Sequence, residues 1–265
     1  MKLFDSHCHL DDHVFDADFG QVLERSQQAG VSAMMIAGIN LATSQKAAAL
    51  AESHQNLYAS AGFHPHDALE ASESVLETLA SLSNHPKVLA WGEIGLDFNR
   101  MFSPRDVQEK WLIRQIELAD AKDLPVIFHE RDSRGRLLEI LKKHHRHTGS
   151  GVIHCFSGTR AELLQYLDMG YSIGITGIVT IQSRGIHLRE LVKEIPRNRI
   201  LIETDAPYLT PAPEKNHTRR NEPAFVRSVL LKLAEVRGED PAELAEEIWD
   251  NTCRLYRLPL EMADL

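Results

Sequence analysis

The sequence has few cysteines, few aromatic residues and no long apolar stretch. Its three cysteines, Cys8, Cys155 and Cys253, are odd in number and far apart, which excludes a disulfide framework and a Cys-x-x-Cys metal site. No segment approaches the roughly 18 consecutive apolar residues that a membrane span needs. The first residues also lack the basic segment and apolar core of a signal peptide, so we expect a cytoplasmic protein without a membrane partner.

An excess of positive charge is absent as well. The formal net charge of -9 argues against a protein that coats nucleic acid irrespective of its sequence, although an enzyme that grips a few phosphates locally remains compatible. The 43% hydrophobic and 25% charged residues are typical of a soluble globular protein. No Gly/Ser-rich linker or low-complexity tract divides the chain. We therefore expect one domain over residues 1–265, and a monomer.

Short apolar runs alternate with helical patterns along the whole chain. The runs predict eight strands, the first beginning at Leu3 and the others at residues 31–37, 57–62, 88–92, 124–128, 151–153, 171–175 and 199–202. Eight strand-then-helix units in about 250 residues predict a (β/α)8 TIM barrel. A doubly wound sheet is the alternative architecture.

Three local signals predict helix ends. Gly30 is expected to follow the C-terminus of the first helix. Ser103 is predicted to cap the N-terminus of another helix, with Pro104 in its first turn. Asp240, followed by a proline, is predicted to cap the last helix.

Residues able to bind a metal follow six of the eight predicted strands. They are His7 and His9 on the first strand, His64 and His66 after the third, Glu93 after the fourth, His129 after the fifth, His154 after the sixth and Asp205 after the eighth. The carboxyl ends of all strands of a barrel meet at one mouth, where such enzymes have their active sites. These residues are therefore predicted to converge, whereas an open doubly wound sheet would spread them along an edge.

The first of these strands has a pattern of its own. Asp5, His7 and His9 alternate along it and are expected to share one face. Two imidazoles with a carboxylate beneath them suit a divalent cation and a partner that orients a ligand. A His-x-His pair alone is more often an ordinary polar strand end, so the signal gains its weight from the other strands.

Several motifs resemble the TatD family of metal-dependent deoxyribonucleases. They are Asp5-Ser6-His7-Cys8-His9, Gly62-Phe63-His64-Pro65-His66, Gly92-Glu93-Ile94-Gly95-Leu96-Asp97, His129-Glu130-Arg131, His154-Cys155-Phe156-Ser157-Gly158, Glu203-Thr204-Asp205-Ala206-Pro207-Tyr208-Leu209 and Arg220-Asn221-Glu222-Pro223. The resemblance runs from residue 4 to about residue 258. It implies an amidohydrolase-like TIM barrel with two adjacent divalent metal ions.

The resemblance also implies a set of ligands. His7, His9, Glu93 and Asp205 would hold one ion, and Glu93, His129 and His154 the other, with Glu93 bridging the two. Imidazole ligands favour Zn2+ or Mn2+ over Mg2+, whereas the family is associated with Mg2+-supported activity. Asp205 is the candidate catalytic residue that orients water and accepts its proton.

Other residues have two open interpretations each. Glu203 is either a second catalytic carboxylate or a buried partner of the site, and Arg131 either clamps a phosphate or pairs with a carboxylate. His64 is predicted to bind substrate rather than metal. Residues 215–220 are either a phosphate contact or a plain surface loop. Cys8 and Cys155 are expected to be small buried hydrophobes.

Three classes of function fit these residues. We expect a hydrolase that cleaves DNA, preferring single strands and acting from an end, because a barrel mouth admits a flexible strand more easily than a duplex. The same ligands would serve an ester or amide hydrolase acting on aminoacyl-tRNA or a small metabolite. A non-catalytic metal-binding protein would not need a water-activating carboxylate, so Asp205 argues against it.

Overall fold

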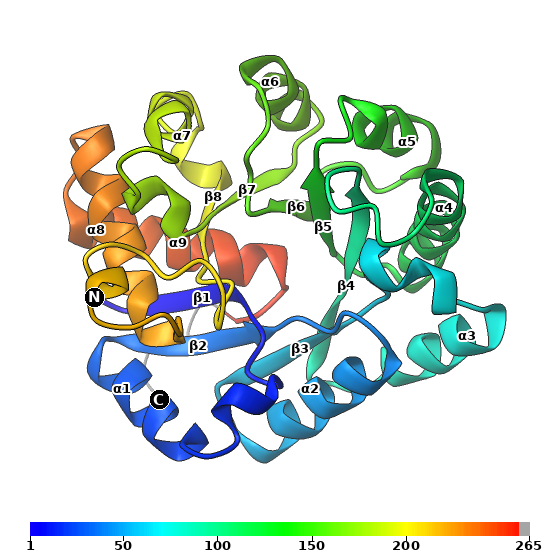
Figure 1. Cartoon of the computed structure of the whole chain (residues 1–265), viewed down its shortest axis with the longest axis horizontal. Helices are drawn as coiled ribbons and strands as arrows, with labels where there is room; N and C mark the ends of the chain where they lie inside the picture. Colours follow the sequence, from blue (N-terminus) through cyan, green and yellow to red (C-terminus); the bar gives the residue numbers. More distant parts are fainter. Residues whose placement is uncertain (260–265) are drawn as a thin grey trace. The chain divides into compact units, whose positions relative to one another are not determined.

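The structure is a computed structural model that describes residues 1–259. Parallel strands alternate with helices along the described chain, and the strand order in the sheet follows the sequence (Figure 1). The strands are β1 Leu3–Cys8, β2 Val31–Ile36, β3 Leu57–Ala61, β4 Val88–Asp97, β5 Val126–Arg131, β6 Gly151–His154, β7 Ser172–Ile175 and β8 Ile200–Ile202. This confirms the predicted (β/α)8 fold class and excludes the doubly wound order.

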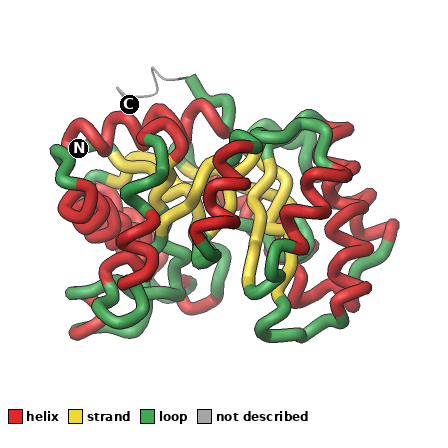
Figure 2. Tube along the Cα trace, turned by 90° about the horizontal axis from the view of Figure 1, so that it is seen from above, coloured by secondary structure: helices red, strands yellow, loops and turns green. Residues whose placement is uncertain are grey.

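Helices connect successive strands and lie over them (Figure 2). They are α1 Phe19–Gln28, α2 Leu41–Ser53, α3 Glu73–Leu82, α4 Arg105–Lys122, α5 Arg136–His144, α6 Arg160–Asp168, α7 Ile186–Leu191, α8 Val226–Arg237 and α9 Pro241–Leu255. None of the helices in the described part of the chain has the length and apolarity needed to cross a membrane. Two predicted helix ends are confirmed: Gly30 follows α1 with φ +90°, and the Asp240 carboxylate accepts hydrogen bonds from the first amides of α9.

The chain divides into two compact units. Residues 1–36 and the chain from Ile173 onwards form the first unit, and residues 37–172 form the second. In the first unit β1 pairs with β2 and β7 pairs with β8, while in the second β3, β4, β5 and β6 pair in succession. The prediction of a single domain over residues 1–265 stays a prediction.

The core of the first unit is built where α9 packs against β1 and β8. The Phe4 side chain is buried, and its ring centroid lies 5.8 Å from that of Trp249 and 6.1 Å from that of Tyr256. The amide of Asn251 donates to the carbonyls of Arg197 and Ile200, which ties the same helix to the start of β8. This helix therefore supports β1, which carries His7 and ends one residue before His9.

Two strands of the second unit extend further than predicted. β4 continues past Gly92 to Asp97, and β5 continues past Phe128 to Arg131. Glycines are poor strand formers, so the two glycines of the Gly-Glu-Ile-Gly motif indicated an early end. In the structure their missing side chains allow β4 to lie close to β5. Glu93 and His129 therefore belong to strands rather than to the loops after them.

The predicted N-cap of α4 is wrong. Pro104, not Ser103, precedes the first residue of the helix. The Ser103 hydroxyl instead donates to the His66 carbonyl at 3.0 Å and accepts from the Leu69 amide at 3.1 Å. Ser103 therefore fixes the short helix after β3, Pro65–Glu70.

Replacing Phe4 by alanine should lower the free energy of unfolding by about 3–5 kcal/mol, because a large buried ring between two aromatic neighbours is lost. Urea denaturation followed by circular dichroism measures the change. Phe4→Leu is the matched control and should lose less, since it leaves a smaller cavity. Equal stability of the alanine variant and the unmodified protein would contradict the packing role of Phe4.

Candidate metal centre

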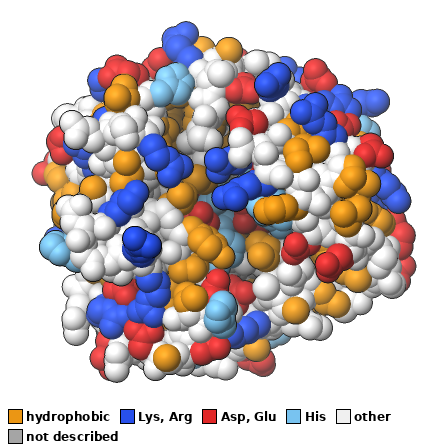
Figure 3. Space-filling model, in the orientation of Figure 1, with side chains coloured by type: hydrophobic (Ala, Val, Ile, Leu, Met, Phe, Trp, Pro, Cys, Tyr) orange, Lys and Arg blue, Asp and Glu red, His pale blue; other side chains and the backbone are white. Residues whose placement is uncertain are grey.

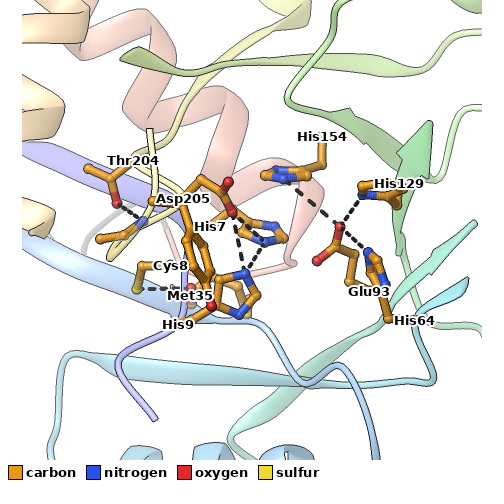
Figure 4. A network of polar contacts seen from close by, with 12 residues as sticks. His7, Cys8, His9, Met35, His64, Glu93, His129, His154, Thr204 and Asp205 are labelled. Carbon is orange, nitrogen blue, oxygen red and sulfur yellow. Dashed lines mark hydrogen bonds and ion pairs between the residues drawn. The ribbon is translucent and has the colours of Figure 1, made fainter. Parts of the chain in front are cut away.

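Three ligand atoms converge at the end of β1 in the first unit. The Nε2 atoms of His7 and His9 are 3.3 Å apart, and Oδ1 of Asp205 lies 3.7 Å from the first and 3.3 Å from the second (Figure 4). Two ligands bound about 2.0–2.1 Å from one tetrahedral ion lie about 3.4 Å from each other. The spacing of these three atoms therefore fits a divalent cation.

Backbone contacts set this arrangement. The Asp205 amide donates to the His7 carbonyl at 2.9 Å, and the His9 amide donates to the Ala206 carbonyl at 2.7 Å. β8 ends at Ile202, and Asp205 has φ +60°, so its side chain is directed by a turn and not by strand alternation. Alternation along β8 therefore does not set the direction of the Asp205 side chain, although its carboxylate lies beside His7 and His9.

Asp5 supports the turn after β8. Its carboxylate accepts hydrogen bonds from the Thr204 amide at 2.8 Å and from the Thr204 hydroxyl at 2.5 Å. Burial raises the pKa of Asp5 to about 8, although the hydrogen bonds from Thr204 act in the opposite direction. Asp5 therefore anchors the residue next to Asp205.

In the second unit one carboxylate oxygen lies among three imidazoles. Oε1 of Glu93 is 2.8 Å from Nδ1 of His129, 3.5 Å from Nε2 of His64 and 4.0 Å from Nε2 of His154 (Figure 4). Glu93, His64 and His154 are buried, and His129 is partly buried. A single oxygen surrounded in this way suits a ligand that is shared between cations.

His129 also faces a second carboxylate. Oδ2 of Asp97 lies 3.5 Å from Nε2 of His129 and 2.6 Å from Nε2 of His66. Burial lowers the pKa of His129, but its contacts with Asp97 and Glu93 outweigh burial and raise the pKa to about 9. The surroundings of His129 thus favour positive charge, as expected where a cation binds. At the neighbouring His64, burial outweighs the opposing effect of the Glu93 carboxylate and lowers the pKa to about 4.

Gly95 allows the side chains of Glu93, Asp97 and His129 to lie close together on β4 and β5. It lies directly opposite His129 in the parallel pairing, with φ +157°. A Cβ atom on residue 95 would lie 1.9 Å from the His129 carbonyl oxygen, so only glycine fits. Glu93 and Asp97 flank this glycine two residues away on either side, which brings both carboxylates to the same imidazole.

Two glutamines of α4 hold the strand ends of the second unit. The Gln115 side chain accepts from the Phe63 amide and donates to the Phe63 carbonyl, next to His64. The Gln108 side chain accepts from the Asp97 amide and donates to the carbonyls of Asp97 and Ser103. Both glutamines are buried, so α4 positions the loop after β3 and the end of β4.

The remaining predicted residues have different surroundings. Glu203 is fully buried, and its carboxylate covers Gly174, where a Cβ atom would lie 2.5 Å from Oε1. Arg131 is exposed at the end of β5. Cys8 is buried as expected, and its thiol lies 3.3 Å from the Met35 carbonyl. Cys155 is only partly buried because it begins a loop with φ +48°, so that expectation is wrong.

Asp97 and its contact with His66 are not among the features predicted from the sequence. The nitrogens of His64, His66 and His129 lie within 4.8 Å of one another, so His66 belongs to the group of potential ligands. Alternation along β4 would have found Asp97, since residues 93, 95 and 97 share one face. The predicted end of the strand at Gly92 hid that signal.

Comparisons with known proteins find relatives over nearly the whole chain. A family model described as "TatD related DNase" matches residues 4–257. Proteins named "3'-5' ssDNA/RNA exonuclease TatD" from Rahnella sp. (strain Y9602) and Pantoea ananatis (strain LMG 20103) are 43% and 42% identical. The alignments cover 97% of this chain and 98% and 100% of those proteins.

Solved structures are similar over the same length. YJJV, a TatD homolog from Escherichia coli, has 33% identity and a TM-score of 0.88, and a TatD family hydrolase from Entamoeba histolytica has 29% identity and a TM-score of 0.87. Each comparison covers 97% of this chain and 98% of the other. The chain therefore belongs to the family of TatD related DNases.

Proposed function

We propose that the protein is a metal-dependent hydrolase that cleaves phosphodiester bonds of single-stranded DNA from an end. The observation that carries the proposal is the Glu93 carboxylate oxygen among three imidazoles, together with the ligand spacing of His7, His9 and Asp205. The names of the relatives support a 3'-5' direction and RNA as a further substrate. A cytoplasmic location and a monomeric state stay predictions from the sequence.

The proposed ligands are those that the family resemblance implies. His7, His9, Glu93 and Asp205 would hold one divalent ion, and Glu93, His129 and His154 the other. Within each unit, the distances between potential ligand atoms support this assignment. When bound, two such cations bring the pKa of water towards neutrality and stabilise the negative charge that develops at the phosphate.

The chain's own residues then have separate tasks. Asp205 orients the attacking water and accepts its proton, and the turn held by Asp5 fixes the direction of its carboxylate. Asp97 holds His129 and His66 in place. Arg131 and His64 are proposed to contact the substrate. Glu203 is fully buried, and its carboxylate lies over Gly174. This environment favours a role as a buried partner of the site over a catalytic role.

The alternative of ester or amide hydrolysis receives no support from the relatives, which are named as nucleases. The release of nucleotides from single-stranded DNA and RNA should be compared with the hydrolysis of aminoacyl and simple ester substrates, with and without a chelator. We expect chelator-sensitive release of nucleotides. Turnover of the esters alone would reject the nuclease proposal.

The metal can be tested directly. We expect the purified protein to contain Zn2+ or another transition metal, because imidazole ligands dominate the site, while added Mg2+ or Mn2+ supports turnover. Metal analysis by mass spectrometry beside an activation series measures both. Full activity of a metal-free sample would be incompatible with the proposal.

Glu93→Gln should reduce bound metal and activity more than the replacement of any single histidine. The amide keeps the shape of the side chain but removes the charge proposed to hold two cations close together. Metal content per chain and cleavage rate measure the effect, and His154→Asn serves as the control because it removes one ligand only. Two tightly held ions and near-normal activity in Glu93→Gln would contradict the bridging role.

Asp205→Asn should abolish turnover while leaving DNA bound. Asparagine keeps an oxygen near His9 but accepts no proton near neutral pH, and loss of a general base costs about 10²–10⁴ in rate. Cleavage rate, DNA affinity and metal occupancy should be measured together. Glu203→Gln is the matched control. If the cleavage rate of Asp205→Asn fell only a few-fold, another group would have to be the general base.

A further inference from the structure

A cavity of about 310 Å³ lies in the first unit, between the loops that follow β7 and β8. Three cations, Arg184, Lys215 and Arg219, line it together with Ile178, Ile181 and Leu209. Its volume lies at the lower end of the roughly 300–1,000 Å³ of small-ligand sites. Figure 3 shows Lys and Arg side chains gathered beside hydrophobic side chains on this face of the unit. The cavity therefore combines an apolar wall with positive charge.

Hydrogen bonds from a nearby helix fix the loop after β7, which forms one wall of the cavity. The guanidinium of Arg189, on α7, donates to the carbonyls of Val179, Ile181 and Gln182 at 2.8–3.2 Å. Residues 177–180 form a short helix, in which the Thr180 hydroxyl donates to the Gly177 carbonyl. The backbone that carries Ile178 and Ile181 is therefore fixed before any ligand binds.

The two loops are also joined to each other. The Thr180 hydroxyl accepts a hydrogen bond from the Ala212 amide at 2.8 Å. Gly177 allows the close approach, because a Cβ atom there would lie 2.5 Å from the Leu209 carbonyl oxygen. Within the loop after β8, the Thr210 hydroxyl donates to the Arg219 carbonyl at 2.8 Å. The cavity is thus a built site rather than a gap between mobile segments.

Arg184, Lys215 and Arg219 differ from the other cations of this region. None of the three side chains forms an ion pair with any residue that the structure describes, and all three are exposed. Arg220, the next residue, is bound by the Asp18 carboxylate through two nitrogens. The Glu214 carboxylate, which precedes Lys215, accepts from the Ser228 hydroxyl. The lining cations remain available to an anionic ligand.

We propose that this cavity binds a nucleotide of the substrate strand, with its phosphates on the three cations and its base against the apolar wall. The inference rests on the proposed function and adds a second contact for the strand beyond the scissile bond. Three observations favour it. The lining cations form no ion pair with any described residue, and the apolar wall suits the face of a base. Leu209 and Lys215 also belong to the same loop as Asp205. Loops after the seventh and eighth strands frequently bind phosphate in this fold class.

The test replaces Arg184, Lys215 and Arg219 together by glutamine. Binding of a fluorescent single-stranded DNA oligonucleotide is measured in chelator, so that neither metal nor turnover contributes. The dependence of log Kd on log salt should become shallower by about 2, since each single-strand phosphate contact contributes about 0.7. In turnover assays KM for the oligonucleotide should rise with kcat unchanged.

The matched control replaces Lys142, Lys143 and Arg146 by glutamine, at and just beyond the C-terminus of α5. It removes the same charge and should leave the salt dependence nearly unchanged. Thermal unfolding checks that both triple variants fold. A free mononucleotide should also be tested as a competitor of the fluorescent oligonucleotide, to tell whether the cavity binds a strand or only the released product. We expect the mononucleotide to compete more weakly than an unlabelled oligonucleotide.

The outcomes separate the two proposals. If the unmodified protein neither binds nor cleaves single-stranded nucleic acid, the proposed function and this inference both fail. If it does so, but the cavity variant and the control have the same salt dependence and KM, the inference alone is overturned. Strong binding of the mononucleotide that is lost in the variant, with unchanged oligonucleotide binding, would also overturn it.

Discussion

A carboxylate buried beside imidazoles is the constraint on which the second unit depends. Removal of the Glu93 carboxylate from water is costly unless positive charge lies next to it. Oε1 of Glu93 lies 2.8 Å from His129, whose raised pKa reflects the carboxylates on both sides of its ring. The raised pKa of His129 favours a protonated ring, which supplies such a charge. A bound cation would provide it in the proposed enzyme, so the same electrostatics that stabilise the fold also favour metal binding.

The supporting contacts are polar and buried, and most join residues far apart in the sequence. Gln108 and Gln115 of α4 hold the backbone next to Asp97 and His64, and Asp5 holds Thr204 next to Asp205. Each of these side chains satisfies backbone groups at a strand end that would otherwise need a water molecule as partner. Potential ligands that are held by such bonds need little rearrangement when a cation binds, which lowers the entropic cost of binding.

Much of the site could be predicted because ligand-type residues follow regularly spaced apolar runs. Where a strand ends within one residue of its predicted end, as β6 does at His154, the side chain lies at the predicted end of the strand. The predicted end of β4 was wrong because a glycine there is needed for close packing between strands. Gly95 weakens the strand signal, yet it allows β4 to lie against the backbone of His129. Ser103 is a good N-cap residue by type, but its hydroxyl is engaged by the loop after β3.

The fold class, the family and the types of residue at the strand ends could be predicted from the sequence alone, because they depend on local periodicity and on motifs within a few residues. Which atoms come into contact depends on the folded arrangement of the elements. Asp97 joins His66 to His129, a turn directs Asp205, and two loops line a cavity that three cations also border. These contacts connect residues separated by tens to hundreds of positions along the chain. Their geometry arises from packing and hydrogen bonding between elements, for which no local pattern in the sequence exists.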